Sequence, residues 1–247
     1  MKKNVYDFPV RVTHWLLAIL FISAFAIAKI VDDESPIFTQ HMILGILLST
    51  TALIRIFWGL IGSPYARFTS FPLSVPKLFS YIRNFFQSPG NQYFAHNPAS
   101  AWAGLTMIFL ALGLGSTGYL MSIGYKESLE DLHELLANLF ALIAIAHVSG
   151  VLLHQLRHRD GIFWSMIHGK KNETGYDLEI SNSHPIIALI FVGFLGLISF
   201  QLYTNFDTSK STTKFLGITL NLGDQTSDED HELSLIHISE PTRQAEI

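Results

Sequence analysis

Two histidines, His133 and His147, lie at the two ends of an apolar run. In an α-helix, about 14 residues rise ~21 Å and stop about 40° short of four full turns, so both imidazoles lie on one helix face at different depths. The face between them carries mostly small residues, which leave room for a flat ligand: Ala137, Phe140 and Ala144, with Gly150 just beyond. Because a histidine inside an apolar run is costly in a membrane, this pattern indicates a functional site.

His14 and His41 follow the same pattern, since each stands near the start of another apolar run. Four histidines on three helices can form two pairs, and neutral imidazole is a good axial ligand of haem iron. The chain has no cysteine, which excludes disulfides, iron–sulfur clusters held by Cys and covalent c-type haem attachment. The residues therefore predict a membrane protein that carries two haem b groups, held by axial ligands and non-covalent contacts.

The composition is that of a membrane protein. Of the 247 residues, 49% are hydrophobic and 15% charged, and the mean hydropathy is +0.33. Apolar stretches that approach or reach the ~20 residues needed to cross a bilayer predict spans at residues 13–31, 41–61, 102–123, 132–154 and 185–203. The first stretch lacks a signal-peptide cleavage site and is expected to remain as a span. The predicted fold is all-α: an integral membrane four-helix bundle around two haems, followed by a fifth, C-terminal transmembrane helix.

Lysine and arginine in the loops predict the orientation of the chain. They concentrate at residues 1–12, 63–101 and 155–184, whereas the loops at 32–40 and 124–131 are mainly acidic. This distribution places the N-terminus in the cytoplasm and the C-terminus on the opposite, periplasmic side.

The orientation gives each histidine a depth, which pairs His14 with His147 near the cytoplasm and His41 with His133 near the outer side. Two haems held by these pairs would lie ~20 Å apart. Arg55 is a candidate partner for a haem propionate, and it fits equally a side chain that extends to the cytoplasmic interface. Taken singly, His14, His41 and His133 also fit interfacial polar residues, and only the depth-matched pairs favour ligation.

The other segments have simpler interpretations. Apolar residues at 75–86 recur at helical spacing, which fits either an amphipathic helix on the membrane surface or a helix packed against the end of the bundle. His154, His158 and His168 are expected to be interfacial or solvated, and His96 and His184 to stand at helix starts.

The C-terminal residues 233–243 read LSLIHISEPTR, which resembles the translated read-through of a sequencing adapter, and the last four residues fit its flank. We therefore interpret residues 233–247 as foreign to the protein. The rest of the chain divides into a haem-binding bundle at 1–171, a linker with the fifth helix at 172–204, and a polar tail at 205–232.

Four segments together resemble the bacterial cytochrome b561 family, which includes the cytochrome b subunits of nickel–iron hydrogenases: VYDFPVRVTHWLL, HMILGILL with RIFWGLIGSPYARF, HNPASAWAGL, and HELLANLFALIAIAHVSGVLLHQLRHR. The resemblance covers residues 5–171 and leaves out the fifth span. It implies a bacterial inner-membrane bundle with two b haems, whose histidine ligands match His14, His41, His133 and His147.

The resemblance implies an electron-transfer function. The leading hypothesis is a diheme cytochrome b that transfers electrons between a quinone pool and a redox partner, either a c-type cytochrome or a hydrogenase- or dehydrogenase-like subunit. Whether it is an enzyme in its own right stays open, because one alternative is a stand-alone quinone reductase with a small diffusible donor. Another alternative is a haem-free membrane scaffold or transporter. The expected partners include the lipid bilayer and quinone, and no nucleic acid.

Overall fold

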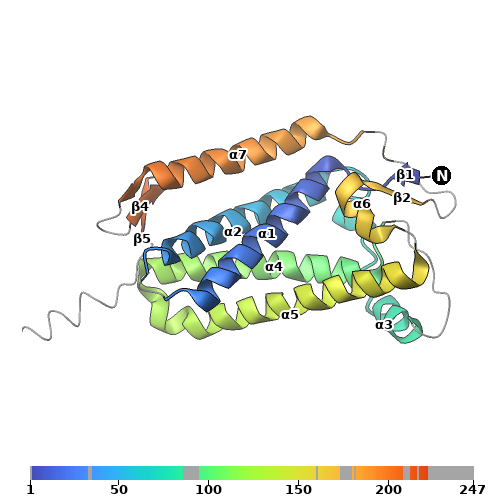
Figure 1. Cartoon of the computed structure of the whole chain (residues 1–247), viewed down its shortest axis with the longest axis horizontal. Coiled ribbons are helices and arrows are strands. Elements are labelled where there is room, and N and C mark those ends of the chain that lie inside the picture. The colour runs from blue at the N-terminus through green and yellow to red at the C-terminus, as the bar shows by residue number, and fades with distance from the viewer. Residues whose placement is uncertain are drawn as a thin grey trace, which may run out of the picture.

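The computed structural model describes residues 2–32, 35–85, 95–159, 161–172, 180, 182–207, 212–215 and 217–221. Its longest elements are helices that run side by side along the long axis of the molecule (Figure 1). They are α1 (Phe8–Ile30), α2 (Phe38–Ile61), α4 (Pro98–Leu120), α5 (Lys126–His158) and α7 (Pro185–Thr204). Each predicted span corresponds to one of these helices.

The connection between α4 and α5 is tighter than the sequence suggests. In place of the predicted loop at 124–131, a π-helical turn, η2 (Met121–Tyr125), leads directly into α5. Gly124 has a φ of 110°, which glycine adopts without the steric penalty of a side chain. The acidic residues that suggest a loop lie in the first turns of α5, where Glu127 is favoured by the helix dipole.

Four helical stretches are long and apolar enough to cross a membrane: Phe8–Ile30, Phe38–Ile61, Pro98–His158 and Pro185–Thr204. The third stretch contains both α4 and α5, which fold back on each other at Gly124 and pack side by side (Figure 1). The chain is therefore a multi-pass membrane protein.

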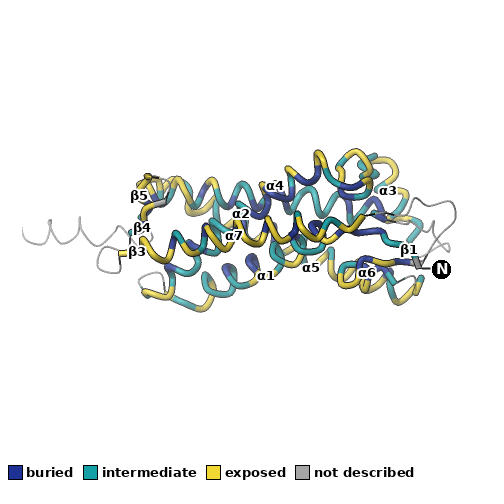
Figure 2. The backbone as a smooth tube through the Cα atoms, turned by 90° about the horizontal axis from the view of Figure 1, so that it is seen from above, coloured by how far each residue is buried: buried dark blue, intermediate teal, exposed yellow. Residues whose placement is uncertain are grey.

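The helices α1, α2, α4 and α5 form a bundle. Helix α1 packs along α2, α2 along α4, and α4 along α5. Their buried apolar side chains form one cluster: Leu20, Phe21, Leu48, Ala52, Ile108, Ala111, Leu114 and Phe140. In Figure 2, buried and exposed positions alternate along the long helices, as expected for helices that contact neighbours on one side only.

The basic segments of the chain gather at one end of this bundle. There β1 (Lys2–Asn4) pairs antiparallel with β2 (Lys170–Asn172), beside α6 (Ile162–His168). The predicted helix at 75–86 is α3 (Val75–Asn84), which packs against α4 while Phe79 and Ile82 remain exposed. It lies across the end of the bundle, next to a 3-10 turn, η1 (Phe68–Ser70), in the chain (Figure 1).

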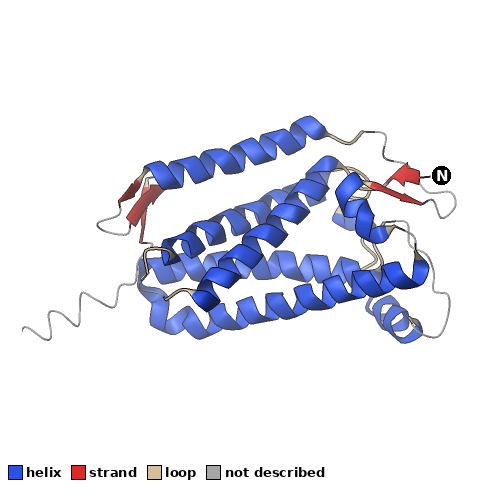
Figure 3. Ribbon diagram, viewed as in Figure 1, coloured by secondary structure: helices blue, strands red, loops and turns tan. Residues whose placement is uncertain are grey.

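Beyond the bundle, α7 packs against α1 and α2 and leads into a small antiparallel sheet. The sheet has the order β3 (Phe206–Asp207), β4 (Thr212–Phe215) and β5 (Ile218–Asn221). These strands occupy residues that were expected to form a polar tail, and they lie at the end of the molecule opposite to β1 and β2 (Figure 3). The segment interpreted as adapter read-through, 233–247, lies outside the described residues.

Candidate haem-binding site

Two of the predicted ligands, His41 of α2 and His133 of α5, meet near the end of the bundle that carries η2. Their ring centroids are 6.1 Å apart and their planes are inclined by 73°. Two imidazoles that share one metal ion through bonds of ~2 Å have centroids about 6 Å apart. The centroid spacing of this outer pair therefore fits two imidazoles that bind one iron.

Each ring of the outer pair also has a hydrogen-bond acceptor at Nδ1. The Nδ1 of His41 lies 2.9 Å from the carbonyl oxygen of Ala24, which can only accept, so this nitrogen carries the proton. The Nδ1 of His133 lies 2.7 Å from Oγ1 of Thr117, whose own hydroxyl donates to the Gly113 carbonyl at 2.9 Å. Protonated Nδ1 leaves the Nε2 lone pair of both rings available to a metal.

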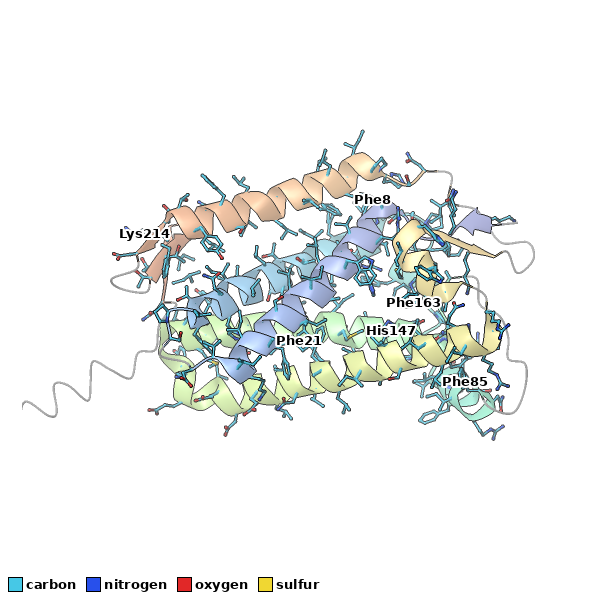
Figure 4. All side chains as sticks on the ribbon, in the orientation of Figure 1. Phe8, Phe21, Phe85, His147, Phe163 and Lys214 are labelled. Atoms are coloured by element: carbon cyan, nitrogen blue, oxygen red, sulfur yellow. The ribbon has the colours of Figure 1, made fainter. Side chains whose placement is uncertain are left out.

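The inner pair, His14 of α1 and His147 of α5, lies deeper toward the basic end. The two rings are close enough for their charges to interact. His147, labelled in Figure 4, lines a cavity of about 310 Å³ between α3, α4 and α5. Gly150 lines the same cavity, and a Cβ added there would meet no other atom within 4 Å. The small residue that the sequence pattern placed beyond His147 thus leaves open space beside the ring.

Arg55 supplies a buried cationic group near the inner pair, within electrostatic reach of the Asp7 carboxylate. Its side chain is only 6% exposed and lies within electrostatic reach of His14. Nη2 donates to the Ala66 carbonyl at 3.2 Å and the guanidinium packs over the ring of Phe68, but the buried Nη1 has no hydrogen-bond partner within the described part of the chain. A buried, unsatisfied guanidinium N–H is costly, and an anionic group such as a carboxylate would satisfy it.

A stacked aromatic pair lies between the two histidine levels. Phe140 stands seven residues from both His133 and His147, and its ring stacks on that of Phe21 of α1 with centroids 3.9 Å apart and an interplanar angle of 20°. The two side chains are 5% and 6% exposed. Figure 4 labels Phe21 on α1 and His147 on α5 at different positions along the bundle. Phe140 therefore packs against the neighbouring helix and does not itself leave space for a flat ligand.

His154 is more deeply placed than the sequence suggests, whereas His184 is placed as expected. His154, expected to be interfacial or solvated, is 1% exposed, and its Nδ1 lies 3.1 Å from the hydroxyl of Tyr81 on α3. His184 is the N-cap residue of α7, as expected.

His96, expected at a helix start, stands just before Asn97, which is the N-cap of α4. Its ring packs against Phe71, and its buried Nδ1 has no hydrogen-bond partner among the described residues. Burial lowers the pKa of His96 to about 3, and the nearby charges of Arg55 and His147 lower this pKa as well. This electrostatic proximity to the inner level is not visible from the position of His96 in the sequence.

These features fit the binding of haem. The ring centroids of the outer pair lie 6.1 Å apart, and the inner pair lies beside open space and near a buried arginine. Gly45 lines a cavity of about 60 Å³ together with His41 and His133. A Cβ added at Gly45 would meet no other atom within 4 Å, so there is open space beside the outer pair.

Comparison with known proteins identifies a family over this part of the chain. The family model described as prokaryotic cytochrome b561 matches residues 5–169, which include all four histidines and end before α7. No curated protein and no solved structure matches the chain significantly. Membership of this family implies a b-type cytochrome of the membrane, and hence haem b and electron transport. The chain belongs to the prokaryotic cytochrome b561 family.

Proposed function

We propose that this protein is a diheme cytochrome b that transfers electrons between a quinone pool and a redox partner in a bacterial inner membrane. The observation that carries the proposal is the outer pair, in which the ring centroids of His41 and His133 are 6.1 Å apart and Nδ1 of both rings is already hydrogen-bonded. Haem bound between such rings supplies reversible one-electron oxidation and reduction of its iron.

The side chains of the two levels have distinct tasks in this proposal. His41 and His133 hold the outer haem, and the Ala24 carbonyl and Thr117 hydroxyl fix the orientation of their rings. His14 and His147 hold the inner haem, and the buried Nη1 of Arg55 donates to a propionate of that haem. Because this donation would satisfy an otherwise unpaired N–H, it is favoured over extension of Arg55 to the interface.

The separation of the two levels supports electron transfer across the bilayer. Fourteen helical residues between His133 and His147 correspond to ~21 Å, and the stacked rings of Phe21 and Phe140 fill the intervening space without polar groups. Apolar packing keeps water away from the interior, which holds each haem in a low-dielectric environment.

The cavity beside His147 is the proposed place of quinone exchange. It is lined mainly by apolar side chains, and it is bordered by Tyr81, whose hydroxyl is hydrogen-bonded to His154. A haem held by His14 and His147 would supply one-electron acceptance for a quinol bound there. Of the two protons that the quinol would lose with its two electrons, one would leave through the Tyr81–His154 hydrogen bond and the other to solvent. The apolar lining suits a quinone ring.

The redox partner is a c-type cytochrome or a hydrogenase- or dehydrogenase-like subunit. The distribution of basic residues supports a cytoplasmic N-terminus and a periplasmic end that carries η2 and the β3–β5 sheet. A partner on the periplasmic side would exchange electrons with the outer haem.

Haem content tests this proposal. The purified protein should show the dithionite-reduced spectrum of a b-type cytochrome, and a pyridine haemochrome assay should give two haems per chain. Replacing His147 with alanine should remove one haem and largely spare the other. A well-folded protein without haem would contradict the proposal, and a His147→Ala variant that keeps both haems would contradict the pairing.

A further inference from the structure

The C-terminal residues that follow the region matched by the family model lie against the outer histidine pair. The match ends at residue 169, whereas α7 and the strands β3 to β5 follow it in the chain. Of these later residues, Leu220 on β5 reaches the cavity that His41 and His133 line together with Gly45, Gly118 and other residues of α2 and α4. Leu220 is 6% exposed although it lies on a short strand at the end of the molecule.

Contacts on three sides fix this strand in place. Leu220 packs with Ile43 of α2 and with Ile198 and Leu202 of α7 in a separate buried cluster. The hydroxyl of Thr213, on the neighbouring strand β4, is buried and donates to the Leu202 carbonyl at 2.9 Å. This bond satisfies a carbonyl in the last turn of α7, where the helix itself provides no partner.

The end of α7 is also joined directly to the start of α2. The hydroxyl of Tyr203 donates to Oε1 of Gln40, the residue that precedes His41. On its other side β5 contacts η2, the turn that joins α4 to α5. The strand thus bridges the ends of α2 and α4, which line the cavity together with His133 of α5.

From this placement we propose that the C-terminal sheet closes the outer haem site, with Leu220 as the side chain that shields it from water. The proposal rests on the proposed function, because it requires a haem between His41 and His133. Leu220 is then a positioning residue, which acts through the environment of the haem and not through its ligands.

The physical consequence concerns both redox potential and access. An apolar wall disfavours the ferric form, which carries more positive charge than the ferrous form, so it raises the midpoint potential of the haem. The same wall keeps small polar oxidants away from the haem edge. The outer haem is therefore expected to exchange electrons more readily with a docked protein than with a small diffusing reagent.

Substitution of Leu220 tests the proposal in the full-length protein. Leu220→Asp should lower the midpoint potential of the outer haem, because a carboxylate beside it stabilises the ferric form, and should speed its oxidation by ferricyanide severalfold. The outer transition is identified as the one that disappears in His133→Ala. The matched control is Thr219→Asp, which puts the same charge on the exposed, opposite face of the same strand.

Two milder variants keep the test decisive if Leu220→Asp does not fold. Leu220→Ala opens the wall without adding charge, and Thr213→Val removes the hydrogen bond that holds the sheet to α7. Both should speed the oxidation of the outer haem by ferricyanide and leave the inner haem unchanged.

The outcomes separate this inference from the proposed function. If the wild-type protein binds two haems but Leu220→Ala and Thr213→Val oxidise at the wild-type rate, the sheet does not shield the site and the inference is overturned. Equal effects of Leu220→Asp and Thr219→Asp would also overturn it. If the wild-type protein binds no haem, the proposed function itself fails.

Discussion

At the scale of single residues, the hydrogen bonds behind the outer histidines are the most informative feature of the site. The hydroxyl of Thr117 both accepts from Nδ1 of His133 and donates to the Gly113 carbonyl, so it fixes which ring nitrogen carries the proton. Such partners behind a metal ligand raise the basicity of the imidazole and hold the ring in one orientation.

Thr117→Val keeps the shape of the side chain but removes the acceptor. We expect the affinity of the outer site for haem to fall by about 10–100-fold, and the midpoint potential of that haem to rise, because a less basic imidazole stabilises ferric iron less. Haem titration of the apoprotein and redox potentiometry measure the two effects. The control is Thr51→Val, since Thr51 is also buried and its hydroxyl donates to the Leu47 carbonyl of its own helix. An equal loss in both variants would contradict the role of Thr117.

His96 leads to a prediction about pH. Its pKa in the folded protein is about 3, below the value of 6.5 that an unperturbed histidine has. As the pH falls below 6.5, the unfolded chain binds a proton that the folded protein does not bind, so the free energy of unfolding decreases until the pH approaches 3.

His96→Phe removes this titration and keeps an aromatic ring against Phe71. We expect the variant to lose less stability than the wild-type protein between pH 6.5 and pH 4. Thermal unfolding in detergent at a series of pH values measures the difference. Parallel stability curves for the two proteins over this range would show that His96 is not buried in its neutral form.

At the scale of elements, close packing of α2 against α4 positions the outer pair. Gly115 of α4 permits this approach, because a Cβ at that position would overlap the side chain of Ser49 on α2. Gly104 lies on the same helix, but a Cβ added there would meet no other atom within 4 Å. The two glycines therefore offer a matched test of helix packing within the membrane.

Gly115→Ala should lower the free energy of unfolding by about 1–3 kcal/mol, the usual cost of overpacking a close contact. Gly104→Ala should be neutral or slightly stabilising, because alanine favours the helix. Thermal unfolding followed by circular dichroism in the same detergent compares them. Equal stability of the two variants would mean that α2 and α4 do not touch at Gly115.

The helices themselves were largely predictable, and the connections between them were less so. Hydropathy places all five long helices because a bilayer requires about 20 apolar residues, whatever the tertiary packing. The turn at Gly124 was missed because acidic residues are typical of loops and equally of the first turn of a helix. Residue type alone does not separate these two cases.

At the scale of the whole molecule, the sequence predicts which histidines share a level but not what surrounds them. Depth follows from helix rise and orientation, and both are readable from spacing and charge. By contrast, the partner of His154 is Tyr81, 73 positions earlier, and Leu220 lines the cavity beside His41 although it comes from a stretch with little apolar pattern. Such contacts depend on how separate elements meet in space, so no local sequence pattern predicts them.

The arrangement of the whole chain in the membrane yields the last prediction. Basic residues lie at the end of the bundle that carries β2, whereas acidic residues lie near η2, at the end that also carries the β3–β5 sheet. Because the chain has no cysteine, a single introduced cysteine is the only thiol available to a labelling reagent. Cysteines at three exposed positions would show on which side of the membrane each end of the bundle lies and whether α7 crosses it. These positions are Glu127 at the start of α5, Lys170 on β2 and Thr219 on β5, the strand that follows α7 in the chain.

In cells with a permeabilised outer membrane, a membrane-impermeant maleimide should label Glu127→Cys and Thr219→Cys, and should label Lys170→Cys only after the inner membrane is disrupted. Labelling of Glu127→Cys and Thr219→Cys together requires that α7 crosses the membrane after the four-helix bundle. If Thr219→Cys instead labels with Lys170→Cys, α7 does not cross, and the sheet cannot cover the outer haem from the periplasmic side. If the labelling of all three variants is reversed, the result still agrees with the fold, but the basic residues do not set the orientation of the chain in the membrane.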